Sequence, residues 1–316
     1  MKNLSKLVLV LFLSFGIFSC DDDDDSTPPV VNLPDNTFTI IAASADHTVL
    51  EQLLIDTGLD QVLSGGTFTV FAPTDNAFTG VDTSGLTTEQ VTNILLNHVV
   101  TGNVLSTDLS NGYVKTNATE TYSGNDNFID MYINVDSGVL LNGSATVAPA
   151  DLESANGTVH VVDEVIMIPN VVNLAAANPM FSNLAAALTQ EDLLGVLSTE
   201  ADASPAPFTV FGPDNTAFDN FLAEDNGFDT IEDVLALPIL ADVLTYHVIP
   251  NAAVRAGDIT DGLSPATVQT ETLTINTTSG VTITDQNNRV VNVVATDVTG
   301  SNGVIHVIDN VILPTL

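Results

Sequence analysis

The chain of 316 residues has few basic residues, one cysteine and no tryptophan. Five Lys and Arg stand against 40 Asp and Glu. Such acidity repels nucleic acid and anionic lipid surfaces, so we expect neither as a partner of the folded part. A single Cys cannot form an intramolecular disulfide, so each domain must be held together by its hydrophobic core. With no Trp and only four Tyr, aromatic platforms for stacking sugars are sparse.

Sequence signatures of catalysis are also absent. There is no G-x-S-x-G nucleophile turn, no G-x-x-x-x-G-K-[ST] phosphate loop and no G-x-G-x-x-G dinucleotide motif. Two nearby carboxylates could hydrolyse a glycoside, but among 40 acidic residues such a pair carries no information. We therefore predict a protein that is not an enzyme and needs no cofactor.

The N-terminus is typical of a secreted lipoprotein. Lys2 and Lys6 precede an apolar run from Leu7 to Phe18, which is too short to span a bilayer and indicates a signal peptide over residues 1–19. The run ends in a small residue before Cys20, as in the bacterial lipobox. We expect Cys20 to be lipidated after cleavage; the alternative is an idle thiol in a short signal sequence.

Residues 20–35 predict an extended acidic tether. Asp21 to Asp25 are followed by Ser, Thr and two Pro, a composition that cannot bury apolar surface. The D-x-D-x-D-G spacing of a calcium loop is missing, so we predict no metal site there. Acidic residues after a lipidated Cys resemble a surface-export signal in one bacterial group and an inner-membrane retention signal in another. A run of five favours export, which predicts an outer-membrane, surface-exposed protein.

Cleavage makes the chain still more acidic. Removing residues 1–19 takes away two Lys and no acid, leaving 3 basic against 40 acidic residues and a formal charge of −37. Such charge keeps a protein soluble and could attract divalent cations loosely, without a dedicated site.

Three sequence motifs occur twice in the same order. The segment TVFAPTDNAF (69–78) returns as TVFGPDNTAF (209–218), and NILLNHVV (93–100) as DVLTYHVI (242–249). The closing segment NGTVHVVDEVIMIP (156–169) returns as NGVIHVIDNVILP (302–314). A period of about 140–149 residues, far above the 20–50 residues of solenoids, indicates a duplicated domain. The second copy gains nine residues between its first two motifs, around Glu224 to Ala236.

The three boxes resemble those of the fasciclin-like domain, and the resemblance covers about residues 36–316. It implies an α+β fold in which helices pack on a twisted β-sandwich, or wedge. We therefore predict two tandem domains, over residues 36–169 and 170–316. The central box departs from the family pattern in one copy: Tyr246-His247 of the second copy stands where the first has Asn97-His98.

Hydrophobic spacing predicts the main elements of each copy. Apolar residues from Val49 to Leu54 and from Leu184 to Leu197 recur at helical spacing. The TVFAP and TVFGP segments predict strands that end at a Pro, followed by side-chain caps at Thr74-Asp75 and Asp214-Asn215. The central boxes predict helices that carry their histidines on the apolar stripe. The closing boxes predict strands covered on both faces.

The motif histidines and aspartates are the candidates for chemistry. They are His98, His160 and Asp163 in the first copy and His247, His306 and Asp309 in the second. One interpretation is a metal or acid–base site. The other, which we favour, is that these buried groups hydrogen-bond the backbone and fix the helix to the sheet. A zinc site needs a third ligand, which two histidines do not supply. Asp163 and Asp309 lie three residues after their histidines, which places them on the opposite face of the strand.

The resemblance implies adhesion through extracellular or envelope partners, in some animal relatives through the tyrosine–histidine region. Only Tyr246 and His247 match that region, so they are the candidate binding residues, with helix packing as the alternative role. Three functions stay open: a lipid-anchored adhesion or interaction module, a lipoprotein that captures a glycan or a small apolar ligand, and a passive spacer of the envelope. The partner could be a protein or a glycan.

Overall fold

The computed structural model describes residues 33–224, 227–278 and 280–315. The signal peptide, Cys20 and almost all of the predicted tether lie outside the described residues. Within them, no single helix is long and apolar enough to cross a membrane; only one sharply bent pair, 171–177 with 179–190, has the length and composition.

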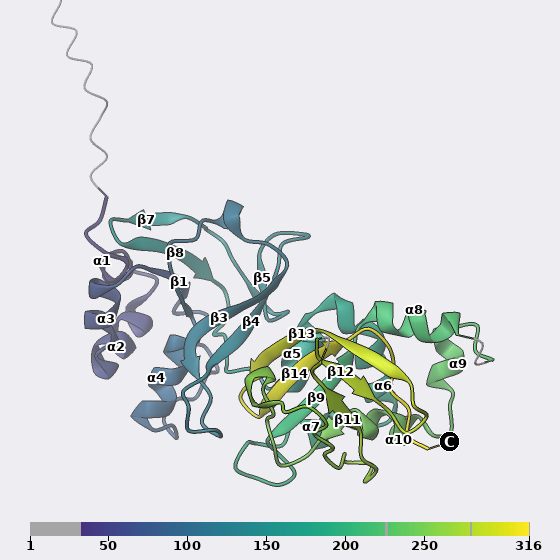
Figure 1. The fold of residues 1–316 in the computed structure, drawn as a ribbon. Helices are drawn as coiled ribbons and strands as arrows, with labels where there is room; N and C mark the ends of the chain where they lie inside the picture. Colours follow the sequence, from purple (N-terminus) through teal and green to yellow (C-terminus); the bar gives the residue numbers. More distant parts are fainter. Residues whose placement is uncertain (1–32, 225–226, 279, 316) are drawn as a thin grey trace, which may run out of the picture. The chain divides into compact units, whose positions relative to one another are not determined.

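The first domain begins with three short helices and places its first and last strands side by side (Figure 1). Its helices are α1 (Thr37–Ala42), α2 (Thr48–Thr57), α3 (Leu59–Gly65), α4 (Thr88–Leu96) and the 3-10 turn η1 (Ser106–Asp108). Its strands are β1 (Phe68–Pro73), β2 (Val99–Thr101), β3 (Gly112–Thr119), β4 (Phe128–Asn134), β5 (Leu140–Leu141), β6 (Ala145–Thr146), β7 (Leu152–Ser154) and β8 (Gly157–Val162).

The second domain repeats this order with additional helices between its first two strands. Its helices are α5 (Val171–Ala177), η2 (Pro179–Phe181), α6 (Ser182–Gln190), α7 (Leu194–Leu197), α8 (Asn215–Ala223), α9 (Ile231–Leu235), α10 (Leu240–Tyr246) and η3 (Ala256–Asp258). Its strands are β9 (Phe208–Pro213), β10 (Val248–Ile249), β11 (Thr274–Asn276), β12 (Thr282–Thr284), β13 (Val290–Gly300) and β14 (Gly303–Ile308).

The first and last strands of each domain pair in parallel. In the first domain one sheet has the order β2-β1-β8-β7 and a second sheet the order β3-β4-β5-β6. In the second domain a single six-stranded sheet runs β10-β9-β14-β13-β12-β11. The difference lies in β13, an 11-residue strand whose bulges let it pair with both β12 and β14. The equivalent stretch of the first domain is split into β6 and β7 around Pro149, which has no N–H for a ladder.

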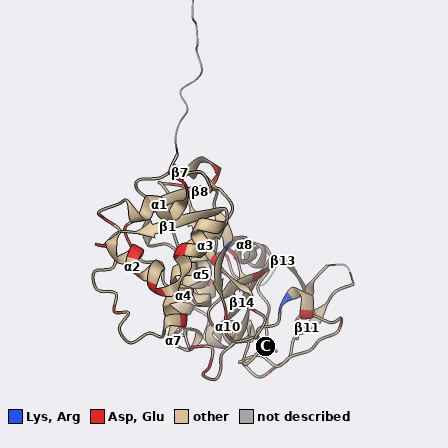
Figure 2. Ribbon diagram, turned by 90° about the vertical axis from the view of Figure 1, so that its left-hand side faces the viewer, with Lys and Arg blue, Asp and Glu red and all other residues tan. Residues whose placement is uncertain are grey.

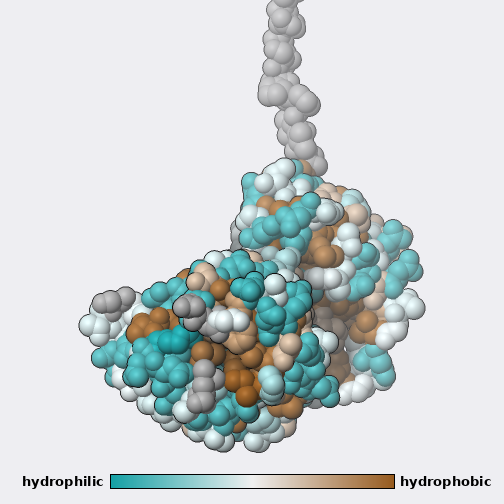
Figure 3. Space-filling view, turned by 90° about the vertical axis from the view of Figure 1, so that its right-hand side faces the viewer, coloured by the Kyte–Doolittle hydropathy of each residue, from teal (hydrophilic) through white to brown (hydrophobic). Residues whose placement is uncertain are grey.

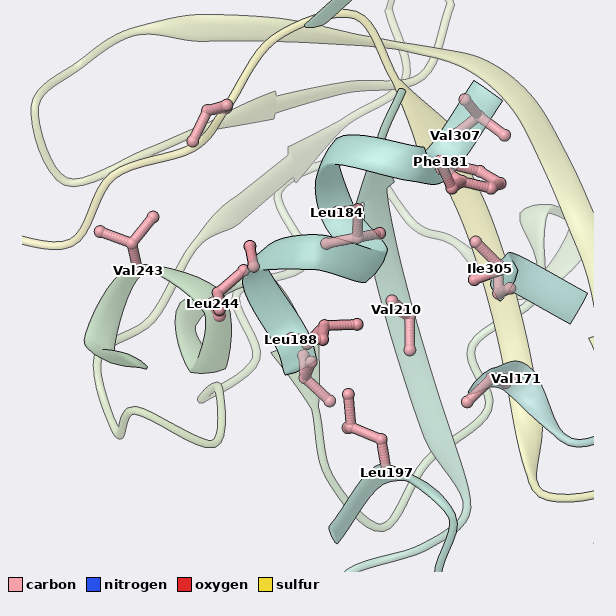
Figure 4. Packing of buried hydrophobic residues seen from close by; sticks show 14 of the residues in the cluster. Val171, Phe181, Leu184, Leu188, Leu197, Val210, Val243, Leu244, Ile305 and Val307 are labelled. Carbon is pink, nitrogen blue, oxygen red and sulfur yellow. The ribbon is translucent and has the colours of Figure 1, made fainter. Parts of the chain in front are cut away.

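The first strand of each domain packs on both faces, because neighbouring residues of a strand point to opposite sides of the sheet. In β1, Val70 and Ala72 pack under the helices, whereas Phe71 packs against β4, β5 and β6. Val210 and Phe211 of β9 divide in the same way. Figure 4 shows Leu184, Leu188 and Leu197 from the helices meeting Val210 and Ile305 from the sheet. The predicted α+β fold, with helices on a twisted sandwich, is confirmed.

The opening helices and the first strands form as predicted. Helix α2 ends at Gly58, whose φ of +74° is the left-handed conformation that glycine adopts without strain. The two residues of the predicted cap pair have different hydrogen-bond partners. Thr74 and Asp214 cap the local turn through the backbone N–H of Ala77 and Ala217. Asp75 instead accepts from the N–H of Val49, at the start of α2.

The central helices end earlier than predicted. Helix α4 stops at Leu96 and α10 at Tyr246, so His98 lies just beyond its helix and His247 is the C-cap. The carbonyl oxygens of the two histidines accept hydrogen bonds from Phe71 N–H at 2.8 Å and Phe211 N–H at 2.9 Å. The backbone must extend at this point to pair with β1 or β9, and that pairing ends the helix.

The closing strands are also shorter than predicted. Strand β14 ends at Ile308, opposite Pro213, and β8 ends at Val162, opposite Pro73. A Pro removes the donor that would continue the ladder, so the last residues of each box run on outside the sheet. All six residues of each strand are buried, as predicted for a covered strand.

Candidate functional site

The central histidine of each domain joins the end of a helix to the closing box. Nδ1–H of His98 donates to the carbonyl of Ile94 at 2.8 Å, and Nε2 accepts from the N–H of Ile166 at 2.8 Å. His247 donates to Val243 O at 2.7 Å and accepts from Ile312 N–H at 3.2 Å. Both rings are therefore neutral, with the proton on Nδ1.

Burial fixes that protonation state. Desolvation lowers the pKa of His98 and of His247 to about 4, although the carbonyl that each ring faces works in the opposite direction. A neutral ring whose two nitrogens are both engaged inside the protein has no lone pair for a substrate or a metal. These two groups act as structural links between helix and closing box.

The second histidine of each domain sits in the parallel strand pair. Nε2–H of His160 donates to Val104 O at 3.0 Å, and that of His306 to Val254 O at 2.8 Å. Their rings stack on Phe71 and Phe211, with centroid distances of 5.4 and 5.7 Å. Burial lowers the pKa of both imidazoles, so they too are held neutral.

The aspartates of the closing boxes face away from the histidines. Asp163 accepts from the N–H of Thr146 at 2.6 Å, and Asp309 from the N–H of Asn292 at 2.8 Å. The carboxylate nearest to His160 belongs instead to Asp151, at 3.8 Å from Nδ1. Since Ser106 donates to Asp151 and not to the ring, this group is no hydrolase triad.

Sequence reasoning gave no role to Asp151 or to Asp297, its equivalent in the second domain. Both have positive φ, and both place a backbone N–H on Nδ1 of their histidine. Within the described residues, no group of three or more His, Cys, Asp or Glu is arranged to hold a metal ion.

The candidate binding pair Tyr246-His247 lies in the core. Tyr246 is 0 % and His247 2 % exposed, and the Tyr246 hydroxyl donates to Thr272 O at 2.9 Å. Burial raises the pKa of Tyr246 to about 12. The interpretation of this pair as a surface binding element needs correction, because neither side chain is open to a partner. The first domain fills the place with Asn97, whose amide donates to the carbonyls of Ile166 and Met167.

A second missed motif residue is the asparagine that opens each closing box. The side-chain amide of Asn156 donates to the carbonyls of Leu63 and Gly66, and its oxygen accepts from Thr37 N–H. Asn302 makes the same three bonds in the second domain. The repetition of N-G in both copies was the signal, because a helix end needs partners for its free carbonyls.

Two of the three basic side chains that the structure describes, Lys115 and Arg255, lie where the two domains meet. Among the described residues Lys and Arg are scarce and Asp and Glu are spread over many elements (Figure 2). The ammonium of Lys115 donates to Asp130 at 2.6 Å within its own domain, and to Asp297 O at 3.0 Å and Thr299 Oγ1 at 3.1 Å in the other. The N–H of Thr299 also donates to Asp130, at 2.6 Å. Burial raises the pKa of Asp130, a cost that Lys115 partly offsets.

Arg255 of the second domain reaches side chains of the first domain. Its guanidinium lies 3.9 Å from the buried carboxylate of Glu120 and 3.5 Å from the hydroxyl of Tyr122. Burial acts to raise the pKa of Glu120, but hydrogen bonds from Ser123 and Asn127 outweigh it and lower the pKa. A cavity of about 570 Å³ lies beside Lys115 and Arg255. Both cations already face carboxylates, so this cavity offers no free positive charge to an anion.

The nine extra residues of the second domain, around Glu224 to Ala236, include one of its helices. The residues in question run from Glu224, the C-cap of α8, through all of α9, and residues 225–226 among them are outside the described part. Arg289 donates to Glu224 at 2.7 Å and lies 5.6 Å from the ring centre of Phe221. The gained segment is thus tied to the start of β13.

Sequence comparison identifies the repeated unit. The model of the Fasciclin domain family matches residues 45–169 and residues 179–314. The chain belongs to the fasciclin family. Its domains are typically cell adhesion or interaction modules and generally not enzymes.

Relatives of this fasciclin protein occur in bacteria and animals. Protein sll1483 of Synechocystis is 37% identical over 183 residues, 55% of this chain and 90% of that protein. Transforming growth factor-beta-induced protein ig-h3 of Sus scrofa is 30% identical over 258 residues, 79% of this chain. Human periostin is 27% identical over 263 residues, 81% of this chain. The alignments span only 35% of the Sus scrofa protein and 29% of periostin.

A solved structure supports the fold of the tandem unit. The FAS1 domain pair of the insect cell adhesion molecule Fasciclin I aligns with a TM-score of 0.53 and 19% identity. The alignment covers 83% of this chain and 95% of that one, so both domains take part. At this identity the likeness shows the fold alone.

Proposed function

We propose that the protein is a non-catalytic adhesion or interaction module of the bacterial envelope, anchored by lipid at Cys20 and exposed at the outer surface. One observation carries the proposal: the two fasciclin domains use the polar groups of their signature boxes internally. The motif histidines, Asp163, Asp309 and Tyr246 all hydrogen-bond within their own domain. What remains for function is the surface and the loops.

The acidity of the mature chain supports an exposed location. A formal charge of −37 after removal of residues 1–19 keeps the domains soluble and apart from anionic membrane surfaces. The lipid at Cys20 supplies membrane attachment, and the acidic segment after it supplies reach. Figure 3 shows one face of the described part, where hydrophobic residues are interspersed with hydrophilic ones.

A deletion strain tests this function. Cells that lack the protein should attach less well to neighbouring cells or to a surface, and the wild-type gene should restore attachment. Complementation with Cys20→Ala should fail, because the released protein cannot hold the cell to its partner. Unchanged attachment combined with a weakened envelope would replace adhesion by the role of a passive spacer.

A further inference from the structure

Two joined cavities run along helix α4 to the start of α5. The first, of about 450 Å³, is lined by residues of α4 and by Thr119 and Thr121. The second, of about 680 Å³, extends to Met167, Asn173 and the 200–202 loop of the second domain. Both are lined by Gln90, Asn93 and Thr121, so they form one continuous groove. Each volume falls in the range of about 300–1,000 Å³ that is usual for ligand sites.

Four side-chain amides line this groove beside five hydroxyl side chains, and helix caps orient three of the amides. Oε1 of Gln90 accepts from Thr87 N–H at 2.9 Å, and Oδ1 of Asn173 accepts from Asn170 N–H at 3.1 Å. Oδ1 of Asn170 accepts from Asn173 N–H at 2.9 Å. Since each oxygen is held by a cap, each NH₂ group is the free end. Within the described part of the chain these three NH₂ groups have no protein partner.

The composition of the groove excludes two ligand classes. None of the described residues that line it is Lys, Arg or His, and Glu89, Glu200 and Asp202 are acidic, so a phosphate or a uronate would be repelled. An apolar ligand would cover the free amides and leave them unpaired, at a cost for each of about 1–3 kcal/mol.

Hydroxyl-rich neutral ligands match these groups. A sugar hydroxyl both donates and accepts, so it can accept from a free amide NH₂ and donate to Glu200, Asp202 or a Thr hydroxyl. Met167, 51 % exposed in the second cavity, offers an apolar surface to the face of a sugar ring. We propose that this groove binds a neutral oligosaccharide chain. The inference deepens the proposed function, because it names the partner of the interaction module as a neutral glycan.

Calorimetric titration of the full mature chain tests the proposal. The neutral probes are cellohexaose, xylohexaose, mannohexaose and laminarihexaose, and the acidic probe is hexagalacturonate. The variants Gln90→Glu and Asn173→Asp keep the capping oxygen, so each domain should melt at an unchanged temperature. Each variant replaces the free NH₂ donor by a carboxylate oxygen, which cannot donate, so a sugar hydroxyl that accepted from the amide loses its partner and affinity should fall at least tenfold. The control Gln61→Glu makes the same chemical change on α3, outside the groove, and should leave affinity unchanged.

A second readout locates the ligand without a variant. In the mature chain the methionines are Met131, Met167 and Met180, so the methyl spectrum is simple. A bound saccharide should shift the Met167 methyl resonance and leave that of buried Met131 in place. The proposal is overturned if no neutral hexasaccharide binds, if only hexagalacturonate binds, or if binding ignores both groove variants. These results do not depend on where the cell displays the protein, so they separate failure of the groove from failure of the adhesion proposal.

Discussion

His98 accepts a hydrogen bond at Nε2 from the backbone N–H of Ile166, 68 residues further along the chain, at 2.8 Å. The same ring donates to Ile94, so one imidazole joins the end of the central helix to the closing box. The second domain makes the corresponding pair between His247 and Ile312. The repeated central histidine, which could be taken for part of a reactive site, therefore stabilises the fold of each domain.

Replacing His98 by Phe should destabilise the first domain. The phenyl ring leaves the buried N–H of Ile166 without a partner and removes the ring's hydrogen bond to the carbonyl of Ile94, which keeps only its bond from the Asn97 N–H at 3.2 Å. We expect a loss of about 3 kcal/mol in the free energy of unfolding, measured by urea denaturation. His247→Phe should have a similar effect on the second domain. A loss below about 0.5 kcal/mol for both variants would contradict the structural role.

The same histidines predict acid sensitivity. Their pKa is lowered from 6.5 to about 4 on folding, so both states are neutral above pH 6.5 and the stabilisation is then complete. As the pH falls from 6.5 toward 4 the unfolded chain binds the proton first, and stability is lost. Each histidine should contribute a slope of about 1.4 kcal/mol per pH unit inside that window.

Comparison with a variant isolates this slope from the many carboxylates. Stability should be measured from pH 7 to pH 4.5 for the wild type and for His247→Gln, whose side chain does not titrate. The difference between the two curves should shrink as the pH falls. Parallel curves would show that His247 does not titrate as described.

Asp75, the second residue of the cap pair in the first box, should matter through a helix start far from it in the sequence. Asp75 accepts from Val49 N–H at 2.9 Å and from the Thr48 hydroxyl at 2.7 Å, and Asn215 accepts from Asn183 N–H at 3.1 Å. Asp75→Ala should therefore cost about 1 kcal/mol in the free energy of unfolding. Asp75→Asn should cost much less, because the second domain already uses Asn there. Equal losses for Ala and Asn would speak against the cap.

Coupling between the domains should depend on Lys115. Lys115→Met leaves the buried carboxylate of Asp130 without its cation, with an expected loss of about 2 kcal/mol in the free energy of unfolding. Calorimetry should then resolve two melting transitions in place of one, since the bonds of the Lys115 ammonium to Asp297 and Thr299 are gone. Glu51→Gln, which removes one charge from a half-buried position on α2, serves as the control. A single transition at the wild-type temperature would refute this role for Lys115.

Most of the fold could be predicted from the sequence, because the duplication doubles every local pattern. The spacing of Val49, Leu50, Leu53 and Leu54 and the stop at Gly58 predict α2 correctly. The ends of the central helices could not be predicted, because His98 and His247 leave the helix to pair with a distant strand. The helical pattern of the apolar residues continues through that point, and only the tertiary partner ends the helix.

Neither the burial of the Tyr246-His247 pair nor the groove along α4 could be predicted from the sequence, and the reason differs from that for the helix ends. The match of Tyr246-His247 to a family pattern suggested a binding element, although the apolar stripe already indicated a buried His247, and only the structure shows that Tyr246 is buried as well. The groove is lined from α4, the 167–173 segment and the 200–202 loop, and its amides serve as helix caps at the same time. Gln90 and Asn173 look like ordinary capping residues in the sequence, and their free NH₂ groups become visible only when the elements are assembled.

Protease shaving of intact cells tests the central claim most directly. Antibodies against each fasciclin domain should detect loss of both domains from protease-treated, intact cells but not from untreated ones, and Cys20→Ala should release the protein into the medium. That outcome is the one expected for a lipid-anchored module displayed at the surface. Protection of both domains until the outer membrane is broken would contradict it, and would place the protein where it cannot hold one cell to another.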